Sequence, residues 1–222
     1  LSKFGKGSIP RPGGDKIGRR RLDTHFEAIK LLGANFIFTR EDYFYTVTAD
    51  QLHGRDILLE EASVTGTANV VMAAVLARGT TTIYNAACEP YLQQLCKMLN
   101  RMGAKISGIG SNLLTIEGVT NLSGTEHRIL PDMVEIGSWI GLAAMTKSEI
   151  TVQNVSWDDL GQIPNVFSKL GIQLERRGDD IFIPSHEDGY KIESYIDGSI
   201  LTVADAPWPG FTPDLLSIVL VV

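Results

Sequence analysis

Three apolar, helix-like segments of the chain each end at a glycine. Gly33, Gly103 and Gly171 follow apolar residues at helical spacing, and they lie 70 and 68 residues apart. A glycine at this place is typical of a helix C-cap, where the backbone turns into a left-handed conformation. Because repeats of this length are supersecondary units that bury their faces against each other, the spacing predicts a repeated fold.

The segment 56–117 carries the fullest copy of the repeat. Its pattern predicts a short strand, a buried helix capped by Ser63, a β-branched strand, an amphipathic helix and two hairpin strands, at residues 56–60, 63–77, 80–84, 91–102, 105–109 and 113–117. The order is therefore βαβαββ. Residues 128–182 are predicted to repeat it, 22–32 to be the second helix of an incomplete earlier copy, and 191 onward to begin a fourth.

The stretch 119–126 is rich in Asn, Ser, Gly and Thr, which favours a hinge between domains. We therefore expect an α+β protein with two domains, 1–122 and 123–222. The chain begins at Leu1 and stops within the apolar run 215–222, without a cap or stop signal. These ends favour a fragment of a longer protein.

Composition is that of a soluble globular protein. Of the 222 residues, 44% are hydrophobic and 21% are charged, and no apolar run approaches the roughly 20 residues that span a bilayer. We expect no signal peptide and no membrane partner. The net charge of −6 argues against nucleic-acid binding, which usually needs a basic face. Two cysteines form neither a disulfide framework nor a zinc pattern, so we expect the reducing cytoplasm and no metal.

Positive charge is concentrated near the start of the chain. Residues 1–30 hold eight Lys or Arg against three Asp or Glu, although the whole chain is acidic. The cations flank the sequence Gly13-Gly14-Asp15, and glycine lets a backbone approach a ligand closely. Arginine offers a planar donor fork that suits phosphate or carboxylate. The segment 11–21 therefore predicts an anion site, the alternative being a solvated basic loop.

Ordered motifs along nearly the whole chain resemble the enolpyruvyl transferase family, and in particular its branch that acts on UDP-N-acetylglucosamine. They are Pro12-Gly13-Gly14-Asp15-Lys16-Ile17-Gly18, Leu22-Asp23-Thr24-His25, Ser63-Val64, Asn85-Ala86-Ala87-Cys88-Glu89-Pro90, Met102-Gly103-Ala104-Lys105-Ile106, Leu130-Pro131-Asp132 and Phe211-Thr212-Pro213-Asp214. The resemblance implies six βαβαββ units in two domains, an inside-out α/β barrel. The chain would supply the remainder of the first domain and the first part of the second.

The resemblance also implies a reaction. The enolpyruvyl group of phosphoenolpyruvate would move to the 3′-hydroxyl of UDP-N-acetylglucosamine with release of phosphate, the first committed step of peptidoglycan synthesis. This addition and elimination needs an acid, a base and cations for the phosphates, but no cofactor. We expect that the chain alone does not turn over, because further family residues would lie in the missing remainder of the protein.

Two acids are expected to be catalytic. Asp15 stands where most of the family has a mobile-loop cysteine that acts as general acid, and the alternative is a turn-forming Asp after two glycines. An ordinary Asp has a pKa near 3.9, so acid catalysis would need that pKa to be raised. Asp214 matches the acid taken as the base for the sugar hydroxyl. Its alternative role is that of an acid in the first turn of a helix.

The resemblance implies substrate contacts from two segments. Arg20 matches the arginine that holds the phosphate of phosphoenolpyruvate, and the other expected binding residues are Arg21, Leu22, Asp23, Thr24, Ser63 and Val64. Ser63 can equally be a simple helix cap, a role that does not exclude binding. His25 is expected to be structural rather than a ligand contact, as a lone histidine more often is.

Three positions depart from the family pattern. Glu61 replaces a lysine and places an anion near the expected diphosphate, Cys88 replaces an arginine, and Thr65 replaces a glycine. Two alternatives stay open, and Glu61 and Cys88 favour the second of them. One is enolpyruvylshikimate-phosphate synthase, which shares fold and chemistry. The other is a non-catalytic relative that binds a nucleotide sugar.

Overall fold

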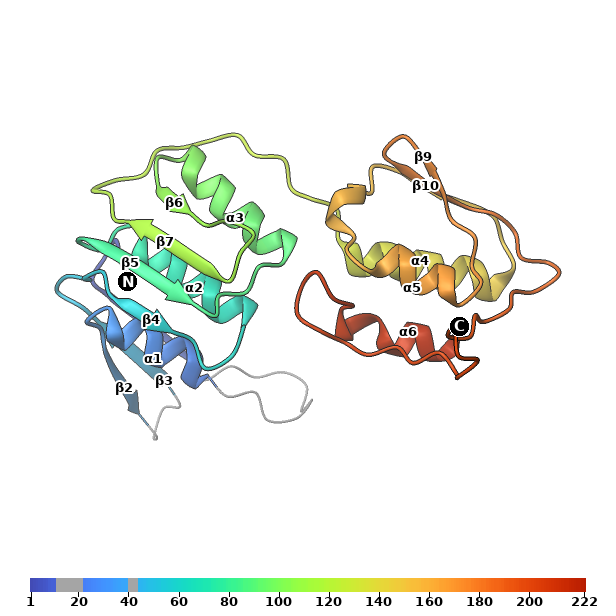
Figure 1. Cartoon of the computed structure of the whole chain (residues 1–222). Coiled ribbons are helices and arrows are strands. Elements are labelled where there is room, and N and C mark those ends of the chain that lie inside the picture. The colour runs from blue at the N-terminus through green and yellow to red at the C-terminus, as the bar shows by residue number, and fades with distance from the viewer. Residues whose placement is uncertain (11–21, 40–43) are drawn as a thin grey trace. The chain divides into compact units, whose positions relative to one another are not determined.

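The computed structural model describes residues 1–10, 22–39 and 44–222. The chain folds as two compact units, Leu1–Arg128 and Ile129–Val222 (Figure 1). The change of unit therefore falls after residue 128 rather than after 122. That 1–122 and 123–222 are the functional domains stays a prediction.

The first part of the N-terminal unit is a three-stranded antiparallel sheet with one helix. Its elements are β1 (Lys6–Pro10), α1 (Asp23–Leu31), β2 (Asn35–Thr39) and β3 (Phe44–Thr48). The strand order is β1-β3-β2, and Thr48 pairs with Lys6 on one side and Asn35 on the other. The expected helix at 22–32 is confirmed.

The second part of this unit is the complete repeat. Its elements are β4 (Asp56–Leu58), α2 (Val64–Ala74), β5 (Thr80–Tyr84), α3 (Pro90–Arg101), β6 (Lys105–Ser107) and β7 (Leu113–Glu117). The sheet order is β4-β5-β7-β6, with β4 parallel to β5 and the other pairs antiparallel. The predicted βαβαββ order is confirmed. The first strand and the first helix end earlier than predicted, at Leu58 and Ala74.

The core of the N-terminal unit forms around α2, which is apolar almost all round. It packs against α1 and α3 and against strands β5 and β7. In β5 and β7 alternate residues point inward, so Ile83, Leu114 and Ile116 are at most 2% exposed. This alternation is what a sheet with one covered face requires.

The C-terminal unit contains α4 (Met133–Thr146), β8 (Ile150–Val152), η1 (Trp157–Asp159), α5 (Ile163–Lys169), β9 (Glu175–Arg177), β10 (Asp180–Ile183), η2 (Pro213–Leu215) and α6 (Leu216–Val221). Its antiparallel sheet has the order β8-β10-β9. The strand predicted to open this repeat, near residue 128, is absent from the described chain, so that prediction was wrong. The backbone of this segment instead bonds to side chains of α3. The Glu126 carbonyl accepts a hydrogen bond from Arg101, and the Arg128 carbonyl accepts one from Gln94.

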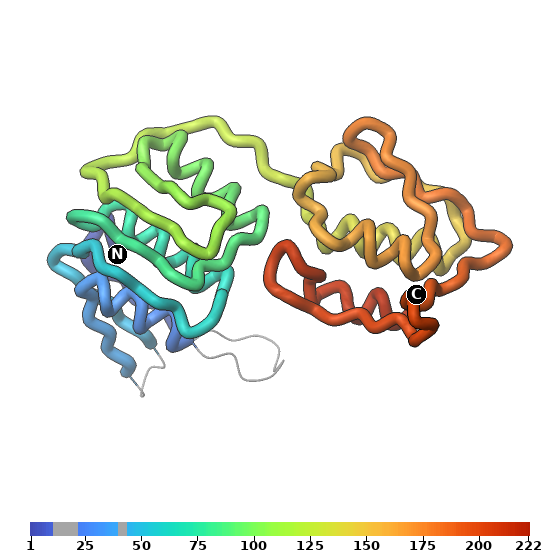
Figure 2. Tube along the Cα trace, in the orientation of Figure 1, coloured from blue at the N-terminus to red at the C-terminus, as the bar shows by residue number. Residues whose placement is uncertain are grey.

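One β-α-β-β motif recurs three times along the chain. The path of the chain through the three copies can be followed from blue to red in Figure 2. The copies are β1-α1-β2-β3, β5-α3-β6-β7 and β8-α5-β9-β10, and in each copy the last strand lies between the other two strands of that copy. Gly33, Gly103 and Gly171 follow the three helices with φ of 103°, 104° and 90°. A side chain is strained in this left-handed region, so the predicted helix C-caps are confirmed.

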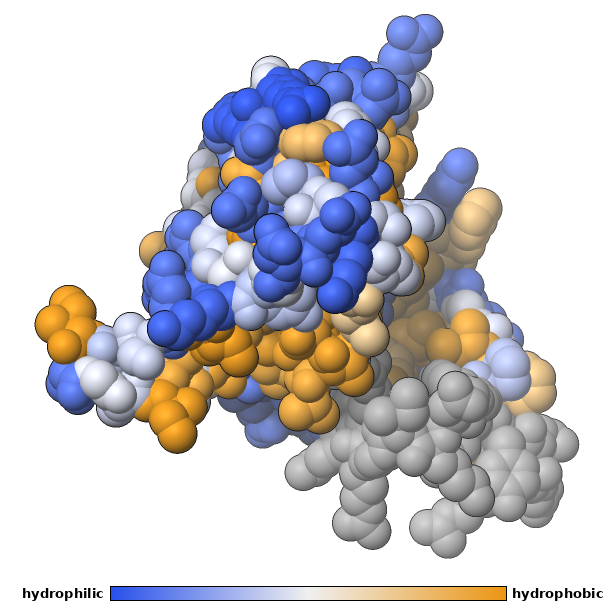
Figure 3. All heavy atoms as spheres, turned by 90° about the vertical axis from the view of Figure 1, so that its right-hand side faces the viewer, coloured by the Kyte–Doolittle hydropathy of each residue, from blue (hydrophilic) through white to orange (hydrophobic). Residues whose placement is uncertain are grey.

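Several apolar side chains of the C-terminal unit remain exposed. Ile196, Ile200 and Leu220 are fully or largely exposed, and Figure 3 shows apolar areas among polar ones on the side it views. Ile196 and Ile200 lie in or beside a short bridge between Ser194 and Ile200, outside the main sheet. The buried core of this unit instead gathers around α4, α5 and β10.

Candidate functional site

The N-terminus of α2 lies beside the N-terminus of α1. Ser63 has an extended backbone and caps α2, its Oγ accepting from the Gly66 amide at 3.1 Å. The other first-turn amides of a helix have no partner within the helix and carry a partial positive charge. This end of α2 can therefore receive an anion such as a diphosphate.

A glycine allows α1 to approach this point closely. A Cβ on Gly66 would lie 3.0 Å from Oγ of Ser63 and 3.2 Å from Cγ2 of Thr24, so a larger residue would force these side chains to shift. Thr24 is buried, and its hydroxyl donates to Oε1 of Glu61 at 3.2 Å. The structure thus brings the predicted segments 22–24 and 63–64 together. Their contact with substrate stays a prediction.

The loop between β5 and α3 is fixed to the same end of α2 by Thr67. This fully buried threonine donates to the Ser63 carbonyl at 2.7 Å and accepts from the Ala87 amide at 3.0 Å. Asn85, with φ of 59°, donates to the Leu59 carbonyl. Sequence reasoning missed Thr67, because a threonine inside an apolar helix gives no sign of a contact with a distant loop.

His25 and Asn69 link α1 to α2 one turn further along. Nδ2 of Asn69 lies 2.8 Å from Nδ1 of His25. Burial lowers the pKa of His25 below its usual 6.5, and the nearby Glu61 carboxylate only partly opposes this shift. The ring is therefore neutral at neutral pH, beside an acid that stands where the resemblance implies a lysine.

Neither cysteine has the properties of an activated nucleophile. Burial and the neighbouring Glu89 raise the pKa of the half-buried Cys88 thiol. Cys96 is buried, as predicted, and burial raises its pKa to about 11. Because the thiolate is the reactive form, both side chains are poorly reactive at neutral pH.

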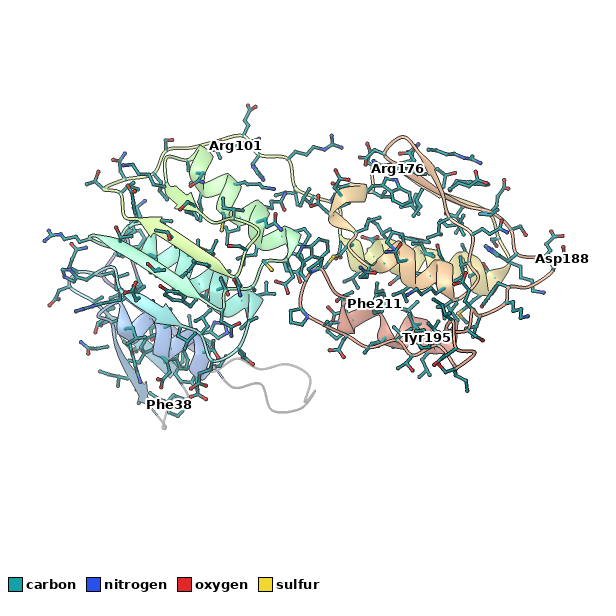
Figure 4. The ribbon with its side chains drawn as sticks, viewed as in Figure 1. Phe38, Arg101, Arg176, Asp188, Tyr195 and Phe211 are labelled. Carbon is teal, nitrogen blue, oxygen red and sulfur yellow. The ribbon has the colours of Figure 1, made fainter. Side chains whose placement is uncertain are left out.

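The remaining predicted residues divide into two groups. Asp15, Arg20 and Arg21 lie outside the described residues. Asp214 is exposed on η2 of the C-terminal unit, three residues after Phe211, which is buried in that unit's core (Figure 4). Asp132 caps α4, its Oδ1 accepting from two amides at 2.8 and 3.4 Å, which is a structural role.

Within 1–10, 22–39 and 44–222, no three side chains of the His, Cys, Asp or Glu type gather closely enough to hold a metal ion. None of the helices in those ranges has the length and apolar character needed to cross a bilayer.

The comparison with known families matches the chain almost from end to end. A family model described as EPSP synthase (3-phosphoshikimate 1-carboxyvinyltransferase) covers residues 2–220. The chain belongs to this family. The expected enolpyruvyl transferase resemblance is therefore confirmed at the level of the family.

Individual relatives within the EPSP synthase family give a more specific comparison than the family model. Three proteins called UDP-N-acetylglucosamine 1-carboxyvinyltransferase match all 222 residues: those of Bacteroides fragilis at 69% identity, Porphyromonas gingivalis at 63% and Treponema denticola at 52%. The chain spans 51% of the length of each of these relatives.

Solved structures confirm the fold. The enolpyruvyl transferase NikO from Streptomyces tendae matches 98% of the chain and 50% of its own, with a TM-score of 0.76 at 15% identity. An EPSP synthase from Acinetobacter baumannii matches 91% of the chain and 45% of its own, with a TM-score of 0.61 at 19% identity. At such identities the likeness concerns the fold alone, and it agrees with the predicted partial α+β enolpyruvyl transferase architecture.

Proposed function

We propose that the intact protein transfers the enolpyruvyl group of phosphoenolpyruvate to the 3′-hydroxyl of UDP-N-acetylglucosamine. One observation carries the proposal: every residue of the chain aligns with relatives named for this reaction, at up to 69% identity. The paired N-termini of α1 and α2 support it, because they form a polar corner that suits a nucleotide diphosphate.

The described residues would hold the nucleotide sugar. Leu22, Asp23 and Thr24 at the start of α1 would line one side, and Ser63 and Val64 at the start of α2 the other. The free first-turn amides of α2 would donate to diphosphate oxygens. Arg20 and Arg21 are proposed to bind the phosphates from the segment that precedes α1.

Two carboxyl groups would move the protons. The oxygen of the 3′-hydroxyl would bond to C2 of phosphoenolpyruvate while Asp214 accepts the hydroxyl proton. In the same step, Asp15 in its protonated form would donate a proton to C3. In the elimination step that follows, C3 loses a proton and phosphate leaves from C2. This restores the double bond on the transferred group. Cations and helix N-termini would stabilise the charge on the phosphates.

The test is a phosphate-release assay on the complete protein. We expect release with phosphoenolpyruvate and UDP-N-acetylglucosamine, and none when 3-phosphoshikimate replaces the nucleotide sugar. Asp15→Asn should abolish turnover because an amide cannot donate the proton, whereas Asp15→Cys should retain it. Asp132→Asn is the matched control, because Asp132 serves as a helix cap.

The same variants test the chemistry of position 15. We expect the wild type to resist epoxide inhibitors that alkylate a loop cysteine, since a carboxylate is a poorer target than a thiolate. Asp15→Cys should become sensitive. Covalent labelling of Asp15 in the wild type, or full turnover by Asp15→Asn, would contradict its assignment as the acid.

Two alternatives are decided by the same assay. The family description favours 3-phosphoshikimate, so phosphate release with that acceptor would identify an EPSP synthase. Glu61 and Cys88 favour a nucleotide-sugar-binding protein without turnover. Tight binding of UDP-N-acetylglucosamine in calorimetry, with no phosphate release, would establish it.

The reaction is proposed to take place in the cytoplasm. The chain has two cysteines, Cys88 and Cys96, which give no disulfide framework, and this supports a reducing compartment.

A further inference from the structure

We propose that Asn69 is a positioning residue, which fixes His25 as the tautomer protonated at Nε2 and makes it a neutral hydrogen-bond donor to an uncharged oxygen of the nucleotide sugar. This inference rests on the proposed function of the corner between α1 and α2. It gives His25 a ligand contact, whereas its sequence pattern favours a structural role.

The tautomer follows from the chemistry of the two groups. The amide nitrogen of asparagine can only donate, so at 2.8 Å the Nδ1 atom of His25 must accept. A neutral imidazole carries a single proton, which then resides on Nε2. Asn69 therefore leaves Nε2–H as the donor that the ring can offer to a ligand.

The two side chains are held in place by packed helices. His25 lies in the first turn of α1, directly after the buried Thr24, whose hydroxyl contacts Glu61. Asn69 lies on α2 immediately before Val70 and Val71, which are 0% exposed. Because α1 packs directly on α2, the imidazole is anchored from the helix that also carries the Ser63 cap.

The surroundings keep the ring neutral. Burial disfavours the imidazolium, and the charge of Glu61 favours it, but burial has the larger influence on the pKa. A neutral donor does not compete for the diphosphate, which the helix amides attract. It suits a carbonyl or hydroxyl oxygen of the base or sugar.

The experiment reads the tautomer directly in the complete protein. Nitrogen-15 NMR of the labelled imidazoles distinguishes the two ring nitrogens, and a His25→Gln sample identifies the His25 signals. We expect Nε2–H in the wild type, a mixture of tautomers in Asn69→Ala, and Nδ1–H in Asn69→Asp, because a carboxylate can only accept. Asn165→Ala, an exposed asparagine on α5, is the matched control and should leave the His25 spectrum unchanged.

Kinetics then test the ligand contact. Asn69→Ala should raise KM for UDP-N-acetylglucosamine about tenfold with kcat little changed, since one hydrogen bond is weakened in ground and transition states alike. His25→Gln removes the imidazole that Asn69 orients, so it should raise KM by at least as much. Adding Asn69→Ala to His25→Gln should then have no further effect.

Three results would overturn the inference: an unchanged tautomer in Asn69→Ala, an altered tautomer with unchanged KM, or an additive KM effect in the double variant. Loss of folding in Asn69→Ala would show in circular dichroism, and Asn69→Asp, which keeps the size of the side chain, would then carry the test. Failure of the proposed function is distinct, because it would appear as absent phosphate release in the wild type.

Discussion

The helices α2 and α4 hold the same place in two copies of one repeat, but their N-termini are capped in different ways. Ser63 is neutral and satisfies one amide of α2, whereas Asp132 is charged and satisfies two amides of α4. An aspartate cap neutralises the positive end of its own helix, and a serine cap leaves that end available to a bound anion. The first copy therefore leaves a helix N-terminus that can receive an anion, as the proposed function requires, and the second copy has a structural helix start.

A second difference lies one turn into the two helices. Thr67 is fully buried and joins α2 to the loop that carries Ala87 and Cys88, while Ile136, at the same distance from its cap, is an apolar core residue of α4. The same position of the repeat is thus polar in α2, where the side chain holds a loop, and apolar in α4, where it packs in the core.

The largest expected effect tests whether each copy has its own core. Phe167 is 0% exposed on α5, and Leu99, at the same distance from its helix-ending glycine, is 6% exposed on α3. Phe167→Ala should destabilise its unit by about 3–5 kcal/mol, and Leu99→Ala should destabilise the other by about 2–5 kcal/mol. Hydrogen exchange measured by mass spectrometry should show each loss confined to one unit, and protection lost equally in both units would contradict separate cores.

The buried threonine provides the next test. Thr67→Val keeps the shape of the side chain but leaves the buried Ala87 amide without its acceptor, so we expect a loss of about 1–3 kcal/mol in the free energy of unfolding. The matched change Ile136→Val should cost about 0.5–1.5 kcal/mol through lost packing alone. Urea unfolding measures both. A neutral Thr67→Val would show that the loop does not depend on this bond.

Exchanging the caps separates their electrostatic roles. Ser63→Asp keeps a good cap but adds an anion at the start of α2, so KM for UDP-N-acetylglucosamine should rise at least about tenfold, or ~1.4 kcal/mol. The reciprocal Asp132→Ser should leave KM unchanged, because α4 holds its own carboxylate at its N-terminus. Steady-state kinetics on the complete protein measure KM for both variants. Equal KM values would contradict the proposed difference between the caps of α2 and α4.

The smallest effect concerns pH. The pKa of His25 is lowered in the folded chain, so below about 6.5 the unfolded chain binds the proton more readily than the native one. Stability should therefore fall as pH drops through and below that value, and His25 should contribute no pH dependence above it. His25→Gln should remove this part of the slope in urea unfolding at pH 5 and pH 7.5. An identical slope in the variant would contradict the assignment.

The sequence predicted what local patterns encode. The glycines at 33, 103 and 171 and the β-branched run 80–84 gave the helix ends and a strand correctly, because backbone conformation and alternation depend on neighbouring residues. The strand expected near residue 128 failed, because nearby carbonyls bond to side chains of α3 that no local pattern reveals.

The candidate site was predictable only in part. The position of Ser63 directly before an apolar helical pattern predicted its role as a helix cap, and the family motif predicted Thr24. The bonds of Thr67 to Ala87 and of Asn69 to His25 join residues 20 and 44 positions apart, and they depend on how helices pack. Such contacts appear only when the fold is known.

The strand order of the recurring β-α-β-β motif bears on how the protein is made. In each motif the strands pair with partners from the same motif, as when Lys6 pairs with Thr48, Thr80 with Glu117 and Ile150 with Ile183. Contacts within one motif close a shorter loop than contacts between motifs, and chains fold from the N-terminus as they leave the ribosome. Each sheet can therefore form as soon as its third strand has emerged, so that nascent edges are covered before the next motif is translated.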